Sequence, residues 1–195
     1  MSKIKSIKIH PIFNRASSYI DHPKGELEIL GDDLGRDCMV NSLVNNNGSY
    51  ILSTYQNNGA CNTDWFSWCA DVLSPINGTV KEVYINPVTN DPGKQNPGRA
   101  SSIILQTTDG VNITLGHIQK PEVKEGDIVI QGQLIAKVGS DGYSRQPHIH
   151  IGAWQAGEPL SIEFDRELMA DIKEKVGEEF WFFGTGSKID KESSK

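Results

Sequence analysis

The sequence predicts a mainly β fold, built from antiparallel sheets, with one C-terminal helix. From residue 78 onward, short runs rich in β-branched or alternating apolar residues recur at 79–85, 102–107, 111–115, 128–130, 134–138 and 148–154. Turn pairs such as Asp109-Gly110 and Asp141-Gly142 separate these runs. The spacing leaves no room for the crossover helices of βαβ units, so the strands are expected to pair antiparallel.

The helix is expected after the last strand. Phe164, Leu168, Ile172 and Val176 lie four residues apart and form one apolar stripe, and Gly177 follows as a stop signal. Before residue 78, the stretch 41–64 is rich in Asn, Gly and Ser and predicts loops around a short strand at 50–54. We divide the chain into an N-terminal arm (1–30), a β domain (31–160) and a C-terminal helix and tail (161–195).

Composition excludes several classes of function. The 195 residues carry 25 acidic and 19 basic side chains, a net charge of −6. A protein that binds nucleic acid through its backbone needs a basic face, so we expect no nucleic-acid partner. No apolar run reaches the roughly 18–20 residues that cross a bilayer, so we expect no membrane span. Cys38, Cys61 and Cys69 show no CxxC spacing, and the sequence leaves a bridge between Cys61 and Cys69 open.

The strongest chemical signal is a pair of histidines in the last predicted strand. Side chains two apart in a strand share a face, so His148 and His150 point the same way among apolar neighbours. Such a pair indicates a metal or hydrolytic site. A third histidine, His117, follows the predicted strand 111–115, whereas His10 and His22 fall in the N-terminal arm and are expected to be exposed.

A metal site of this kind also needs carboxylate or further imidazole ligands. Residues 31–37, GDDLGRD, place Asp33 and Asp37 four apart around a glycine. A turn there would bring both carboxylates to one point.

Residues 139–152, GSDGYSRQPHIHIG, resemble the G-x-x-G-x-S-x-x-P-H-x-H signature of the M23 (lysostaphin/LytM-type) zinc endopeptidases. Two further segments are similar to this family, VKEGDIVIQGQLIAKVG at 123–139 and PINGTV at 75–80. The resemblance extends over roughly residues 31–155, which makes the β domain an M23-like metallopeptidase domain.

The resemblance implies a fold, an activity and a site. The fold is a groove between antiparallel sheets, and the activity is hydrolysis of peptide cross-links or stem peptides in bacterial peptidoglycan by metal-activated water. His150 and Asp37 would be metal ligands. His148 and His117 would be the catalytic pair that handles the proton and the oxyanion.

One position departs from the family pattern. The first ligand of the family is a histidine, and Asp33 stands there when Asp37 is aligned with the ligand aspartate. Asp33, Asp37 and His150 would then hold the ion. Two carboxylates and one neutral imidazole cancel the charge of Zn²⁺, weaken its activation of water, and let Mn²⁺ or another divalent ion compete.

Other assignments of the ligands stay open. In a second alignment Asp71 is the ligand and Ser67 stands at the histidine position, which would be a broken site. In a third, His22 or His10 folds in from the arm; we favour Asp33 with Asp37 over both. The alternative function is a degenerate M23-like domain that binds peptidoglycan or a protein partner without cleaving. A biotinyl- or lipoyl-type carrier domain is set aside, because no lysine occupies a suitable hairpin tip.

The start of the chain has no apolar core typical of a secretory signal. We therefore expect synthesis in the cytoplasm and action in the periplasm or cell wall after delivery by a phage or a secretion machine.

Overall fold

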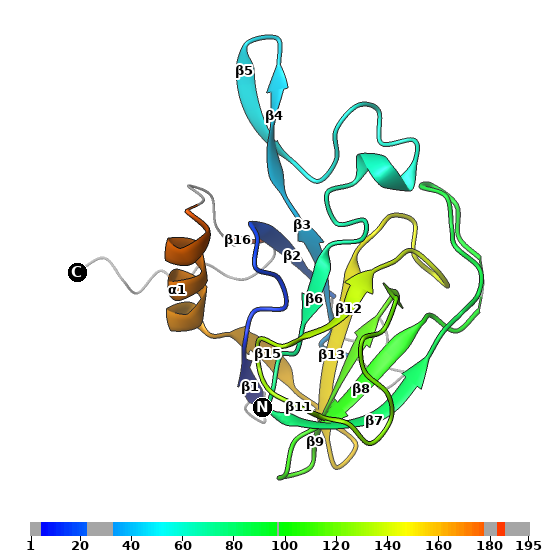
Figure 1. Cartoon of the computed structure of the whole chain (residues 1–195), viewed down its shortest axis with the longest axis vertical. Helices are drawn as coiled ribbons and strands as arrows, with labels where there is room; N and C mark the ends of the chain where they lie inside the picture. The colour runs from blue at the N-terminus through cyan, green and yellow to red at the C-terminus, as the bar shows by residue number, and fades with distance from the viewer. Residues whose placement is uncertain (1–4, 23–32, 97, 178–182, 186–195) are drawn as a thin grey trace.

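The computed structural model describes residues 5–22, 33–96, 98–177 and 183–185 (Figure 1). Its strands are β1 (Ser6–Ile9), β2 (Ser17–Asp21), β3 (Arg36–Val40), β4 (Ser42–Asn46), β5 (Ser49–Ser53), β6 (Asp71–Leu73), β7 (Gly78–Tyr84), β8 (Ser102–Gln106), β9 (Val111–Gly116), β10 (Ile118–Gln119), β11 (Ile128–Val129), β12 (Leu134–Val138), β13 (Ile149–Gln155), β14 (Glu158–Pro159), β15 (Ser161–Phe164) and β16 (Phe183–Thr185). The helices are α1 (Arg166–Val176) and the short 3₁₀ helix η2 (Asn62–Asp64).

The mainly β prediction with a C-terminal helix is confirmed. The largest sheet has the strand order β11-β7-β8-β9-β13-β3-β2-β16, with β14 pairing to β13. Its neighbours are antiparallel except for the β2–β16 pair. A three-stranded sheet, β10-β12-β6, lies in front of β13 in Figure 1, and β1 pairs with β15 in parallel.

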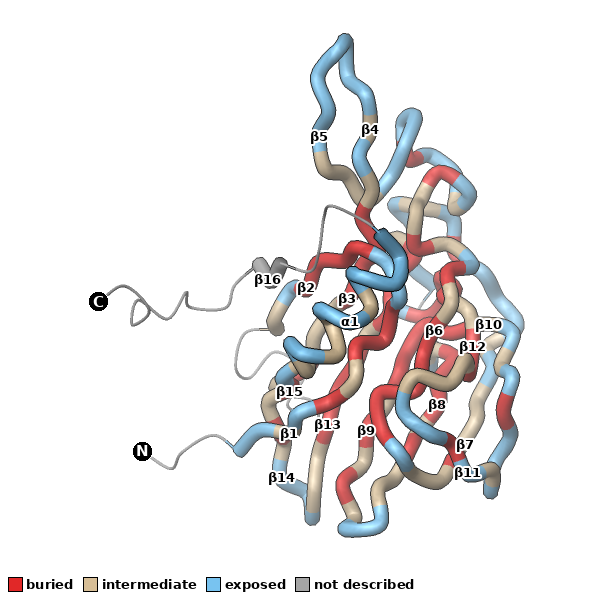
Figure 2. Tube along the Cα trace, turned by 60° about the vertical axis from the view of Figure 1, so that its left-hand side comes forward, coloured by how far each residue is buried: buried red, intermediate tan, exposed pale blue. Residues whose placement is uncertain are grey.

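The large sheet and the three-stranded sheet contribute to one hydrophobic core. Alternate residues of the central strands are fully buried, such as Ile113 and Leu115 of β9 and Ile149 and Ile151 of β13. Val138 of β12 belongs to the same buried cluster. Figure 2 shows the buried segments running through the central strands. Period-2 alternation therefore sends Ile149 and Ile151 of β13 into the core and turns His150 to the other face of the strand.

The seven predicted strands are confirmed to within one or two residues at each end, including the short strand predicted at 50–54, which is β5. The helix is also confirmed. The Asp165 carboxylate accepts hydrogen bonds from the backbone N–H groups of Glu167 and Leu168 at its start, and Gly177 ends it at φ 71°. The predicted tail from residue 186 onward lies outside the described residues.

The N-terminal segment is more than an appendage to this fold. Ile12 and Phe13 are each 1% exposed and belong to the core cluster. Tyr19 of β2 stacks on Phe164 with ring centroids 4.3 Å apart. Residues 5–22 thus help to build the domain that carries the histidines.

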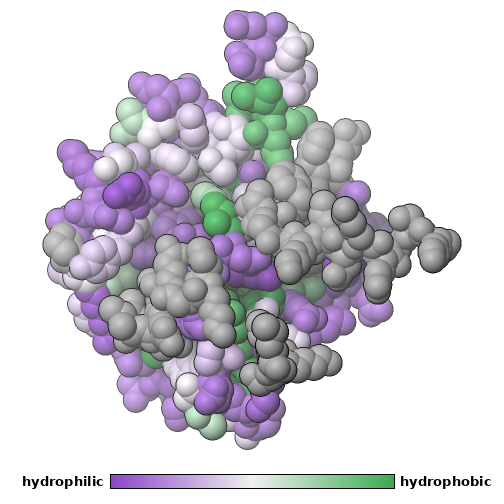
Figure 3. All heavy atoms as spheres, turned by 180° about the vertical axis from the view of Figure 1, so that it is seen from behind, coloured by the Kyte–Doolittle hydropathy of each residue, from purple (hydrophilic) through white to green (hydrophobic). Residues whose placement is uncertain are grey.

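The hairpin of β4 and β5 projects from the body at the top of Figure 1. It carries exposed apolar side chains, including Leu43, Tyr50 and Ile51. Figure 3 shows hydrophobic residues below a hydrophilic tip on this projection.

Among the described residues, no helix has the length and apolar character needed to cross a membrane. Cys38, Cys61 and Cys69 are all free thiols. A Cys61–Cys69 bridge is therefore absent from this structure.

We predict that Phe13→Ala lowers the free energy of unfolding by about 3–5 kcal/mol, because it empties a fully buried aromatic site. The matched control is Ile130→Ala, at a side chain that is 64% exposed, with an expected effect within about 0.5 kcal/mol. Denaturant unfolding of both variants measures the difference. Equal losses would show that the N-terminal segment does not share the core.

Candidate metal and catalytic site

The site is assembled on three neighbouring strands of the large sheet. His150 lies directly opposite Asp37 of β3, and Ile149 lies opposite Cys38. Ile149 and Cys38 face the core at 0% exposure, so His150 and Asp37 share the opposite face. Strand pairing alone therefore brings together two of the predicted metal ligands, which are far apart in sequence.

His22 joins them from the far side of β3. Ile20 of β2 pairs with Asp37, and the His22 backbone N–H donates to the carbonyl oxygen of Gly35 at 3.0 Å. His22 is two residues beyond Ile20, so its side chain is the diagonal neighbour of Asp37 on the same face. The expectation that His22 is exposed is wrong: its side chain is 17% exposed and contacts the Asp37 carboxylate.

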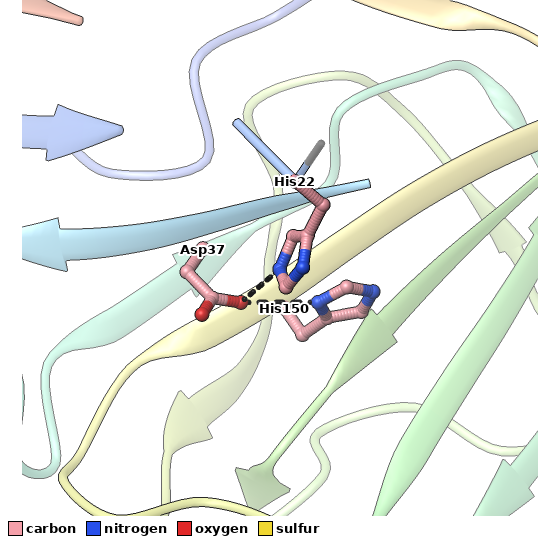
Figure 4. A group of neighbouring side chains, drawn as sticks. All are labelled: His22, Asp37 and His150. Carbon is pink, nitrogen blue, oxygen red and sulfur yellow. Dashed lines mark hydrogen bonds and ion pairs between the residues drawn. The ribbon is translucent and has the colours of Figure 1, made fainter. Parts of the chain in front are cut away.

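One carboxylate oxygen is the centre of this arrangement (Figure 4). Asp37 Oδ1 lies 3.0 Å from His150 Nδ1 and 3.2 Å from His22 Nε2. His148 Nε2 is 3.4 Å from the same oxygen. Burial by itself raises the pKa of Asp37, but hydrogen bonds from His148, His150 and His22 outweigh it and hold the pKa well below its usual range. The carboxylate is thus kept ionised, as a metal ligand must be.

The geometry of His22, Asp37 and His150 fits a divalent ion. Their ligand atoms all lie within 4.8 Å of one another. Two ligands at zinc distances of about 2.0–2.1 Å and at a tetrahedral angle lie about 3.3 Å apart, close to the separations seen here. Two imidazoles and one carboxylate form a three-ligand set of the kind that leaves a fourth position for a water or substrate.

Asp33 is not part of this group. Asp33 lies in a turn, three residues before the start of β3, whereas Asp37 lies within β3. The structure therefore brings together Asp37 and His150 as predicted, and it places His22, rather than Asp33, beside them. The remainder of the predicted turn, Gly31 and Asp32, lies outside the described residues.

The two predicted catalytic histidines border the same site. The rings of His117 and His148 are 4.6 Å apart between centroids and inclined at 50°. Their side chains are 10% and 7% exposed. Burial lowers the pKa of His117, an effect that a contact with Asp141 partly opposes. A neutral imidazole is the form that can accept a proton.

Backbone carbonyls orient both rings. His148 Nδ1 lies 2.8 Å from the carbonyl oxygen of Gln146, and His117 Nδ1 lies 2.8 Å from that of Asp141. A carbonyl only accepts, so each Nδ1 carries the proton that it donates. The Nε2 atom of His148 then points toward Asp37, and that of His117 is available to accept a proton.

The turn that supplies these carbonyls is itself held in place. Asn90 is 2% exposed, and its Nδ2 donates to the carbonyl oxygens of Gly142 and Ser144, each at 2.8 Å. The hydroxyl of Ser144 donates to the carbonyl of Gln146 at 2.6 Å. Asn90 lies in the loop between β7 and β8. It fixes the turn on which the histidine orientations depend.

These features define a class: a β-sheet protein with a histidine–carboxylate metal site and two further histidines at its edge. Residues 67–162 match the model of Peptidase family M23. The chain carries an M23 peptidase domain. The matched region contains His117, His148 and His150, whereas His22 and Asp37 lie before it.

Curated relatives agree with this assignment. Lysostaphin of Staphylococcus staphylolyticus is 43% identical over 82 residues, which are 42% of this chain and 17% of lysostaphin. Glycyl-glycine endopeptidase ALE-1 of Staphylococcus capitis is 42% identical over 62 residues, 31% of this chain and 17% of that protein. The similarity thus spans less than a fifth of either relative's length.

Among solved structures, the catalytic domain of lysostaphin from Staphylococcus simulans is similar, with 25% identity and a TM-score of 0.37. The likeness covers 53% of this chain and 75% of that domain.

The sequence contains a weak signal for His22. The segment 17–21 is a short strand-like run, and His22 follows it directly. Its partner strand lies beyond residues 23–32, so the register that places His22 beside Asp37 is a tertiary property.

We predict that His22→Ala abolishes metal binding, whereas Asp33→Ala retains it. The wild-type protein is expected to hold about one zinc ion per chain, as a three-ligand site does. Elemental analysis of the purified proteins measures this. Loss of metal in Asp33→Ala together with retention in His22→Ala would return the first-ligand role to Asp33.

Proposed function

We propose that this protein is a zinc-dependent endopeptidase that hydrolyses peptide cross-links or stem peptides of bacterial peptidoglycan. The observation that carries the proposal is the convergence of His22, Asp37 and His150, with His117 and His148 beside them. The M23 family match supports the peptidase activity.

The donor set favours zinc over harder ions. With His22 in place of Asp33, the set has two nitrogens and one oxygen, and imidazole suits zinc better than manganese. One carboxylate leaves a net charge of about +1 on a Zn²⁺ site. A zinc ion held there would supply Lewis acidity, which lowers the pKa of a water molecule and polarises a substrate carbonyl.

His148 and His117 would perform the proton chemistry. Backbone carbonyls hold both rings at Nδ1, and Nε2 of His148 points toward Asp37 at the metal site. Nε2 of one neutral ring accepts the proton of the attacking water and passes it to the leaving amine, and the other ring, as its imidazolium, donates from Nε2 to the developing oxyanion. The close packing of the two rings lets them act on the same carbonyl.

The relatives guide the choice of substrate. The name of ALE-1 describes an endopeptidase for glycyl-glycine bonds, and 62 residues of it align with this chain at 42% identity. We therefore propose glycine-containing cross-bridges as the first substrates to test. Action on peptidoglycan would take place outside the cytoplasmic membrane.

We predict that the wild-type protein releases soluble peptides from purified peptidoglycan and that His148→Ala lowers the rate by about 10²–10⁴-fold while keeping its metal. The matched control is His10→Gln, at a half-buried histidine whose Nδ1 lies 2.6 Å from the carbonyl oxygen of Pro11. Mass spectrometry of the products identifies the bond that is cut.

Two outcomes would overturn the proposal. A wild-type protein that holds no metal, even after soaking with zinc, would leave a domain that binds peptidoglycan without cleaving. A His148→Ala variant as active as the wild type would remove the proposed proton chemistry.

A further inference from the structure

Asp141 is a buried carboxylate beside the catalytic pair. It is 5% exposed and lies in the turn between β12 and β13, at a variable position of the M23 signature. Ser101 holds it at both oxygens: the backbone N–H donates to Oδ1 at 3.0 Å, and the hydroxyl donates to Oδ2. Burying a carboxylate is costly, and these two bonds compensate only part of the cost.

The Oδ1 atom of Asp141 also lies near His117. Asp141 Oδ1 lies 3.6 Å from His117 Nδ1, while the carbonyl oxygen of Asp141 accepts from that nitrogen at 2.8 Å. His117 Nδ1 therefore faces both the backbone carbonyl and the carboxylate of Asp141. This arrangement is that of a histidine backed by a carboxylate, in which the carboxylate fixes the ring and stabilises its charged form.

The backbone of His117 also needs support. Its φ is 61°, in the left-handed region that costs a residue other than glycine about 1–3 kcal/mol. The His117 carbonyl accepts from Gly139 N–H at 2.7 Å, and the neighbouring Ile118 N–H donates to the Ser101 carbonyl at 3.4 Å. Ser101, His117 and the turn at 139–141 thus form one interlocked unit.

We propose that Asp141 is a positioning residue: its backbone carbonyl holds His117 with Nδ1 protonated, and its carboxylate stabilises the imidazolium formed when His117 takes up a proton. The proposal rests on the proposed function for its catalytic consequence, but the orientation of the ring is independent of it.

Asp141→Asn is the decisive variant. The amide keeps the shape of the side chain and its acceptor for Ser101 N–H, and it removes the negative charge. The backbone carbonyl that accepts from His117 Nδ1 is unchanged, so the variant isolates the effect of the carboxylate charge on the ring. Asp109→Asn is the matched control, because Asp109 also precedes a glycine and accepts a hydroxyl, from Thr107 at 2.5 Å, but is exposed.

The first measurement is ¹⁵N NMR of the imidazole rings in the metal-free proteins. In the wild type and in Asp109→Asn we expect a larger fraction of charged, doubly protonated His117 at a given pH than in Asp141→Asn, because only the first two proteins keep the carboxylate. An unchanged charged fraction of His117 in Asp141→Asn would overturn the proposal, whether or not any peptide is cleaved. Ser101→Ala is a second variant, which loosens the carboxylate by removing the hydrogen bond from the Ser101 hydroxyl. Thermal unfolding of all variants checks that their folds are intact.

The second measurement is steady-state hydrolysis of a glycine cross-bridge peptide. We expect Asp141→Asn to lower kcat at least tenfold with KM and metal content unchanged, since the residue touches neither substrate nor metal. A wild-type rate in this variant would make Asp141 merely structural. If the wild type itself cleaves nothing, the proposed function fails while the NMR result still decides whether the Asp141 carboxylate stabilises the charged ring.

Discussion

The site depends on one carboxylate oxygen, Asp37 Oδ1, toward which three imidazole nitrogens converge. An ionised carboxylate that is largely removed from water needs partners, and His22, His148 and His150 provide them. The three rings come from the end of β2 and from β13 and the residue before it. The attraction of nitrogen donors to a single oxygen therefore links strands that pack as neighbours but are distant in the chain.

This convergence requires correct strand registers. In β13 the core-facing Ile149 and Ile151 alternate with His150, and in β3 the core-facing Cys38 follows Asp37. Because the side-chain period in a strand is two, a slip of one residue would bury the ligands and expose the core. Hydrophobic burial thus fixes the register, and the register places the ligands. The stability of the fold and the geometry of the site have the same physical cause.

The orientation of the His117 and His148 rings depends on a second constraint, which comes from loops rather than strands. Carbonyls of Asp141 and Gln146 fix the Nδ1 atoms of His117 and His148, and Asn90 fixes the turn that carries these carbonyls. The left-handed backbone at His117 is tolerated because the residues around it are interlocked. Loop residues around the histidines are therefore as important to the chemistry as the strands beneath them.

The sequence by itself determined the β class, the strands after residue 78, the C-terminal helix, and the pair His148 and His150, because these follow from local periodicity and turn residues. It also singled out Asp37 and His117 through their spacing and family resemblance. It misjudged the position of His22, which was expected in an exposed arm, whereas the structure places its side chain against Asp37. Only the tertiary structure decided this point, since the register of β2 against β3 is set by burial on a shared sheet and has no signature in either segment alone.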